Sequence, residues 1–240
     1  MAQLVEASAE HIAADAAWLA SDAHLALLES YVTARVAVAA VTWGLASYWD
    51  RTSNVIVLEK PDGSTPATEA ARALALNAFH ESLHARYSTD PAATAFFAKL
   101  ALLKQLGNPG GDFLEVVFNR LEDERIMRRE LEVSEQDADE IQWFREAVVE
   151  QRENEYALRH GAGPWTDEPV SRGDQFMVAL TEAIHLPDRR SHTHVYVAAL
   201  LASCEDAVTE AVTGTMADAI GAAHEILRLY KDNLENLVDD

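Results

Sequence analysis

Two histidines four residues apart, with a glutamate between them, are the side chains of this chain best suited to chemistry. Residues His80 to His84 have the sequence H-E-S-L-H and lie inside an amphipathic stretch from Thr65 to Arg86. Side chains four apart on a helix share one face, so both imidazoles can bind one zinc ion at about 2.0–2.1 Å. Glu81 would lie beside the ion, where a carboxylate can take a proton from water. The spacing therefore predicts a zinc hydrolase centre.

A catalytic zinc ion usually takes three protein ligands and leaves one position for water, so a further ligand is needed. The best candidate lies in Asn119 to Arg125, with the sequence N-R-L-E-D-E-R. Glu122 lies four residues from Phe118 and four from Ile126, so it projects from a partly buried stripe. We expect Glu122 to bind the ion. Its neighbour Asp123 could accept a hydrogen bond from a ligand histidine, or could be the ligand instead.

The same acidic segment has a simpler interpretation. Glu–Arg pairs three or four residues apart are common on charged surface helices. Glu122 with Arg125, and Glu124 with Arg128, have this spacing. The segment could therefore be a solvated helix face without a metal.

Both segments together resemble a family of metallopeptidase-like proteins of bacteria and phages. In that family an H-E-x-x-H-A motif is followed downstream by N-x-L-E-D-x-R, and His80 to Ala85 and Asn119 to Arg125 match this pattern. Those proteins are often fused to a von Willebrand factor A-like domain and are similar to the cobaltochelatase T subunit. The resemblance covers roughly a third of the chain.

What the resemblance implies is a gluzincin arrangement, in which a glutamate from a second helix completes the zinc site. The implied ligands are His80, His84 and an acidic residue of the pair Glu122 and Asp123, with Glu81 as the base. The implied reaction is cleavage of a peptide bond in a peptide or protein substrate.

The sequence around the motif predicts an α+β fold, mainly helical and zincin-like, with a small β-sheet beside the motif helix. The run from Val32 to Trp43 alternates and is rich in β-branched residues, which favours a strand and leaves a helix as the alternative. Val55 to Leu58 predicts a short buried strand that forms a hairpin with the preceding residues. Thr65 supplies an N-cap and Pro66 the first helical position of the motif helix. In a zincin, an edge strand beside this helix can pair with an extended peptide.

The remaining chain is expected to be helical. Helices are predicted over 8–29, 92–105, 113–131, 134–158, 175–184 and 195–237, the last broken near Gly214 or Gly221. Gly161 to Asp174 is rich in glycine and proline and is the one convincing linker. We therefore expect a metallopeptidase core, residues 1–160, and a helical C-terminal extension, residues 161–240, packed together. Helices after Val133 leave no room for an A-like domain.

Composition limits the partners. Forty acidic residues against nineteen basic ones give a formal net charge of -21, which repels phosphate backbones and anionic lipids. We therefore expect neither nucleic acid nor membrane as a partner. Met1 to Glu10 lack the basic and apolar regions of a signal peptide, and the single cysteine, Cys204, cannot form an internal disulfide. These features favour a cytoplasmic protein.

The sequence as a whole predicts a zinc-dependent metallopeptidase. Two other functions stay open: an assembly protein that keeps a metal for stability, and an acidic helical module that binds a protein. A hydrolase also needs a donor that stabilises the oxyanion. Seven tyrosines and histidines could chemically supply it: Tyr87, Tyr156, His160, His185, His192, His194 and Tyr230.

Overall fold

The chain divides into two compact units, Met1–Thr89 and Asp90–Asp240. The computed structural model describes residues 16–63, 65–189 and 191–237. The fold is α+β, mainly helical with a small three-stranded mixed sheet. Residues 1–15 lie outside the described ranges, and with them Met1 to Glu10 and the start of the first expected helix.

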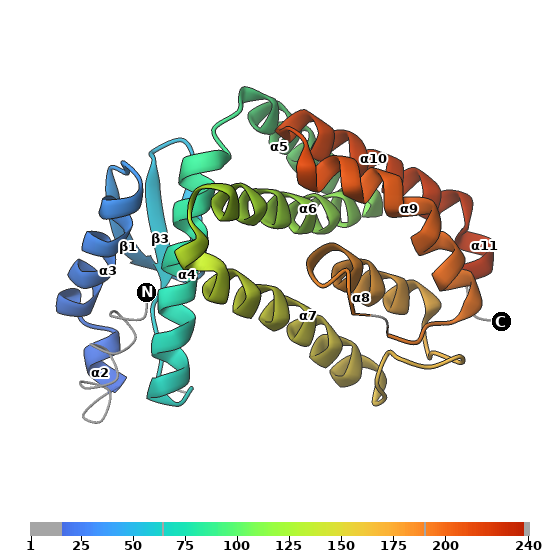
Figure 1. The fold of residues 1–240 in the computed structure, drawn as a ribbon, viewed down its shortest axis with the longest axis horizontal. Helices are drawn as coiled ribbons and strands as arrows, with labels where there is room; N and C mark the ends of the chain where they lie inside the picture. Colours follow the sequence, from blue (N-terminus) through green and yellow to red (C-terminus); the bar gives the residue numbers. More distant parts are fainter. Residues whose placement is uncertain (1–15, 64, 190, 238–240) are drawn as a thin grey trace. The chain divides into compact units, whose positions relative to one another are not determined.

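The N-terminal unit combines the sheet with helices (Figure 1). Its described elements are α2 (Ala16–Leu19), α3 (Asp22–Arg35), β1 (Ala40–Gly44), β2 (Tyr48–Asp50), β3 (Val55–Glu59) and α4 (Ala67–Tyr87). Strand β3 is central, parallel to β1 and antiparallel to β2. In register, Val55 lies opposite Ala40 of β1, and Val57 lies opposite Tyr48 of β2.

One expectation for this sheet is confirmed and two are wrong. The hairpin exists, as β2 and β3. The strand expected from Val32 begins only at Ala40, because Val32 lies one helical turn after Leu28 and both side chains are fully buried on α3. The strand that precedes the motif helix is the central one, so β3 cannot be an edge that pairs with a peptide.

Helices α3 and α4 pack on the sheet and on each other. Ile56 and Leu58, two residues apart on β3, point to the same face. They form one buried cluster with Val32 of α3 and with Leu74 and Ala78 of α4. Burying an aliphatic side chain of this size contributes about 1.5–3 kcal/mol. The cluster therefore fixes which face of α4 is turned to the sheet.

Helix α4 starts one residue later than its sequence predicts. Pro66 is the N-cap and makes no side-chain capping bond, so the assignment of Thr65 as the cap is wrong. The carbonyl of Pro66 accepts the N–H of Ala70 at 2.9 Å. At the other end the N–H of Ser88 donates to the carbonyl of His84 at 2.9 Å. The motif therefore lies in the last two turns of this helix.

The regular elements of the C-terminal unit are all helices in its described residues. Its elements are α5 (Pro91–Gln105), α6 (Pro109–Val133), η1 (Glu135–Asp137), α7 (Ala138–His160), α8 (Arg172–His185), α9 (Val195–Thr213), α10 (Met216–Asp232) and α11 (Leu234–Leu237). Every helix predicted for this part is confirmed, with shifted ends. Helix α6 starts four residues early, because the Asn108 side chain accepts the N–H of Gly110 at 2.9 Å and caps it.

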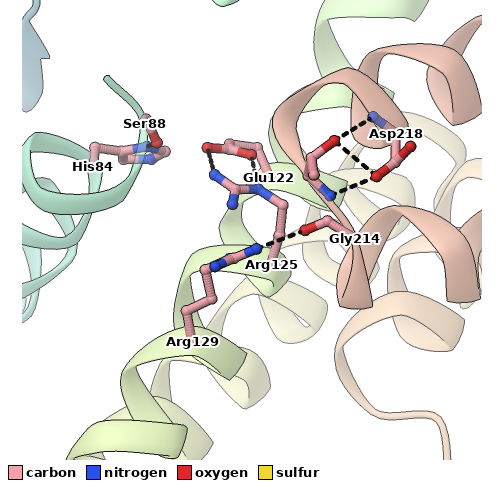
Figure 2. Close-up of polar contacts among 8 residues, drawn as sticks. His84, Ser88, Glu122, Arg125, Arg129, Gly214 and Asp218 are labelled. Atoms are coloured by element: carbon pink, nitrogen blue, oxygen red, sulfur yellow. Dashed lines mark hydrogen bonds and ion pairs between the residues drawn. The ribbon is translucent and has the colours of Figure 1, made fainter. Parts of the chain in front are cut away.

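The long C-terminal helix breaks at Gly214 and not at Gly221. A Cβ at Gly214 would lie 2.5 Å from the carbonyl oxygen of Glu210, which leaves room for glycine alone. Thr215 and Asp218 then cap α10 reciprocally, and Arg129 of α6 donates to the carbonyl of Gly214 at 3.0 Å (Figure 2). The end of α9 is therefore attached to the helix that carries the acidic segment.

Helix α6 organises this unit. It packs on α5, α8, α9 and α10, while α7 packs on α8; Figure 1 shows α6 between α9 and α10 on one side and α7 and α8 on the other. The boundary expected near residue 160 does not coincide with the division at Thr89. The reason is that the loop after His160 joins two helices that pack together. Within the described ranges, no helix has both the length and the apolar character needed to cross a bilayer.

Candidate metal centre

The two histidines of the motif lie on the face of α4 turned away from the sheet. Ala78 packs in the sheet-facing core, and at about 100° per residue His80 and His84 lie roughly 200° and 240° around the helix from it. Their ring centroids are 4.6 Å apart, edge to face. The spacing in the sequence therefore brings both imidazoles together.

This arrangement fits a zinc ion. Two ligating nitrogens on a tetrahedral zinc lie roughly 3.3–3.5 Å apart, given bonds of about 2.0–2.1 Å. Rings with centroids 4.6 Å apart can present one nitrogen each at that spacing. His80 and His84 thus have the chemistry and the separation of a pair that could hold a metal ion.

A buried hydroxyl group orients the second histidine. Nδ1 of His84 lies 3.1 Å from Oγ of Ser88, which is fully buried at the end of α4 (Figure 2). In the tautomer that donates Nδ1–H to this oxygen, Nε2 carries the lone pair that binds metals. Zinc-binding histidines usually have such an outer hydrogen bond.

Glu81 lies beside the first histidine. Its Oε1 is 3.5 Å from Nδ1 of His80, and its side chain is 10% exposed. The neighbouring Ser82 is buried and donates to the carbonyl of Phe79 at 2.6 Å, within its own helix. Glu81 is therefore the acidic group of the motif, held next to the imidazole pair.

In the C-terminal unit, the predicted third ligand is already held by an arginine. Nε of Arg125 donates to one oxygen of Glu122 at 2.6 Å, and Nη2 donates to the other at 2.7 Å (Figure 2). Both side chains are at most 4% exposed. Such a bidentate pair occupies both carboxylate oxygens with charge-assisted hydrogen bonds.

Asp123 is held less tightly inside its own unit. It is buried, and its Oδ2 lies 3.9 Å from Nη1 of Arg120, at the outer limit of an ion pair. That distance is too long for a hydrogen bond. The arginine contact on α6 is therefore longer for the Asp123 carboxylate, at 3.9 Å, than for the Glu122 carboxylate, at 2.6 Å.

Glu124 accepts hydrogen bonds from three cationic or titratable side chains. Arg128 donates at 2.8 Å, Arg145 of α7 donates at 2.9 and 2.5 Å, and Nδ1 of His185 on α8 lies 3.3 Å away. Burial raises the pKa of Glu124, but the hydrogen bonds from His185 and Arg145 outweigh burial and leave the pKa below its usual range. Glu124 is therefore an ionised, fully buried carboxylate.

The Glu–Arg pairs of the simpler interpretation are both present. Glu122 pairs with Arg125 and Glu124 with Arg128. Both carboxylates are buried, however, so this is not a solvated surface face. Arg145 and His185 contribute from other helices, and no local sequence pattern predicts these contacts.

A pocket in the C-terminal unit is lined by Arg128, a partner of Glu124, but by neither Glu122 nor Asp123. It has a volume of about 390 Å³ between α8 and α9 and is lined by side chains such as Leu180, Ala183, Leu201 and Val208. The pocket therefore gives no support to Glu122 or Asp123 as a ligand.

No family model, no curated protein and no solved structure matches this chain. The family resemblance of the two motifs therefore stays a prediction.

Proposed function

We propose that this protein is a zinc-dependent hydrolase of the zincin type that cleaves peptide bonds. The observation that carries the proposal is the imidazole pair of α4, with centroids 4.6 Å apart and Glu81 beside it. The proposed ligands are His80, His84 and Asp123. A peptide or protein as the substrate is favoured by the family resemblance.

The preference for Asp123 over Glu122 reverses the order expected from the sequence. If Glu122 bound zinc, the ion would compete with the buried Arg125 guanidinium, which already bonds to both oxygens of that carboxylate. Breaking a buried ion pair of this kind is costly because it leaves the guanidinium uncompensated. The contact of Asp123 with Arg120 is looser, at 3.9 Å.

The proposed reaction divides the work among these residues. When bound, zinc would polarise the scissile carbonyl and lower the pKa of a water molecule towards about 7. Glu81 would accept a proton from that water and pass it to the leaving amine. The Ser88 hydroxyl would hold the His84 ring in the tautomer whose Nε2 binds the metal.

Metal analysis combined with the variant Glu81→Gln tests the proposal. We expect the purified protein to hold about one zinc per chain and to cleave members of a broad peptide library. Glu81→Gln should keep the zinc and the fold, and its kcat should fall by roughly 100- to 10,000-fold.

Each alternative function gives a different result. An assembly protein would hold zinc without cleaving any peptide, and a binding module with an incidental motif would hold no zinc. Unchanged cleavage by Glu81→Gln would refute the assigned base.

A further inference from the structure

His185 is a buried histidine for which the proposed reaction has no role so far. Its side chain is 0% exposed. Other candidate donors of the C-terminal unit have evident partners: His160 bonds to Asp174 at 2.7 Å, His192 bonds to Asp167 at 2.7 Å, and the ring of His194 caps α9. His185 differs from them in having a buried ring nitrogen, Nε2, with no hydrogen-bond partner among the described residues.

The neighbouring carboxylate decides which nitrogen of His185 carries the proton. Glu124 receives hydrogen bonds from two arginines, so it is ionised and can only accept. Nδ1 of His185, 3.3 Å away, therefore donates to it. Burial also lowers the pKa of His185, more than Glu124 and Asp123 raise it, so the ring is neutral near pH 7. Its Nε2 is consequently an acceptor.

This acceptor has no hydrogen-bond donor among the residues that the structure describes. Nε of Arg120, on α6, is also buried and likewise lacks an acceptor within the described ranges. Nη1 of Arg120 lies 3.9 Å from Asp123, and Nδ1 of His185 lies 3.3 Å from the adjacent residue Glu124. Arg120, Asp123 and His185 therefore belong to one neighbourhood inside the C-terminal unit. Buried polar groups of this kind are usually satisfied by an ordered water molecule that makes about three hydrogen bonds.

We infer that His185 is a positioning residue for Asp123, acting through a shared water molecule. The water donates one O–H to Nε2 of His185 and the other to the Asp123 carboxylate, and its oxygen accepts from Nε of Arg120. This network fixes the orientation of the Asp123 carboxylate. The inference rests on the proposed function, because it takes Asp123 to be a zinc ligand.

Residues that orient a metal ligand typically contribute 10- to 100-fold to metal affinity. His185→Asn isolates this contribution, because the asparagine amide can still donate to Glu124 while Nε2 is lost. His192→Asn is the matched control, since it makes the same substitution at a side chain that is 64% exposed. Arg120→Lys is a second variant that keeps the charge beside Asp123 and removes Nε.

The experiment measures the zinc dissociation constant of each full-length variant by competition with a chelator, and the unfolding midpoint of each metal-free protein. His185→Asn should weaken zinc binding by about 10- to 100-fold with an unchanged midpoint. Arg120→Lys should weaken zinc binding in the same direction, and His192→Asn should match the wild type. Equal zinc affinity of His185→Asn and the wild type would overturn the inference.

Two further outcomes separate this inference from the proposed function. A wild-type protein that binds no zinc contradicts the proposed function itself, before any variant is compared. Nitrogen-15 NMR of histidine-labelled, metal-free wild type tests the inference without zinc and without any variant. We expect a proton on Nδ1 of His185 and none on Nε2, and a proton on Nε2 would overturn the water arrangement.

Discussion

The two motif helices hold their functional side chains in different ways. On α4, His80 and His84 meet each other one turn apart, and Ser88 contacts His84 one turn later. All these contacts are made within a single helical segment. On α6, the consecutive residues Glu122 and Asp123 project about 100° apart, and each meets a different arginine.

This difference shows that a sequence motif can pair two side chains by spacing but does not decide which of two neighbouring carboxylates binds a metal. The i, i+4 spacing on α4 is sufficient to pair two imidazoles, whatever surrounds the helix. On α6, Glu122 and Asp123 are chemically similar, but their arginine contacts are 2.6 and 3.9 Å long. Contact geometry, and not position in the motif, makes Asp123 the better candidate ligand.

The largest expected effect concerns the imidazole pair. His84→Ala should weaken zinc binding by on the order of 100- to 1000-fold, the share of one ligand in a site of this kind. His160→Ala should leave zinc affinity unchanged, because that ring pairs with Asp174 in the C-terminal unit. Chelator competition measures both affinities. An unchanged zinc affinity in His84→Ala would show that this residue of α4 is not a zinc ligand.

A paired substitution on α6 tests the choice between the two carboxylates. Asp123→Asn should weaken zinc binding by on the order of 100-fold. Glu122→Gln should leave zinc affinity nearly unchanged and lower the free energy of unfolding by about 3–5 kcal/mol, because it leaves Arg125 buried without a counter-charge. Chelator competition and urea unfolding separate these effects. The opposite pattern would return Glu122 to the role of ligand.

A smaller effect is expected for the outer hydrogen bond on α4. Ser88→Ala removes the hydroxyl that contacts Nδ1 of His84 and should weaken zinc binding by roughly 10-fold. Ser82→Ala is the matched control, since that buried hydroxyl donates to the backbone carbonyl of Phe79. Equal zinc affinities of the two variants would show that Ser88 does not orient the ligand.

The smallest expected effect is a dependence of stability on pH, which arises from the buried pair His185 and Glu124. The pKa of His185 is lowered from 6.5 by burial, so in the unfolded chain this residue binds a proton at a higher pH than in the folded one. Its contribution to stability is present above about pH 6.5 and is lost as the pH falls. The pKa of Glu124 is lowered from 4.5, so its contribution is lost below about that pH.

Thermal unfolding at a series of pH values measures this dependence. The unfolding temperature should fall by a few degrees between about pH 7.5 and 5.5. In His185→Asn this part of the decrease should be smaller, with the remainder from His24, whose pKa burial also lowers, whereas the decrease below about pH 4.5 should remain. A wild-type unfolding temperature that does not change above pH 5.5 would show that His185 has the same pKa in both states.

Much of the fold near the motif could be predicted from local signals. The end of α4, the α5 helix, the β2–β3 hairpin and the break at Gly214 follow from proline, glycine and capping side chains near them in the chain. The start of β1 could not be predicted in this way, because Val32 and its neighbours belong to helix α3, where Val32 is buried. The central place of β3 depends on β1 pairing with it, which no local pattern encodes.

For the candidate site, the sequence by itself determined the juxtaposition of His80 and His84, because helical spacing is a local property. Only the tertiary structure decided the environment of the acidic segment. The partners of Glu124 come from Arg145 and His185, 21 and 61 residues further along the chain. Such contacts depend on how α6, α7 and α8 pack together. A separation of 21 or 61 residues along the chain does not by itself determine how far apart two side chains lie in space.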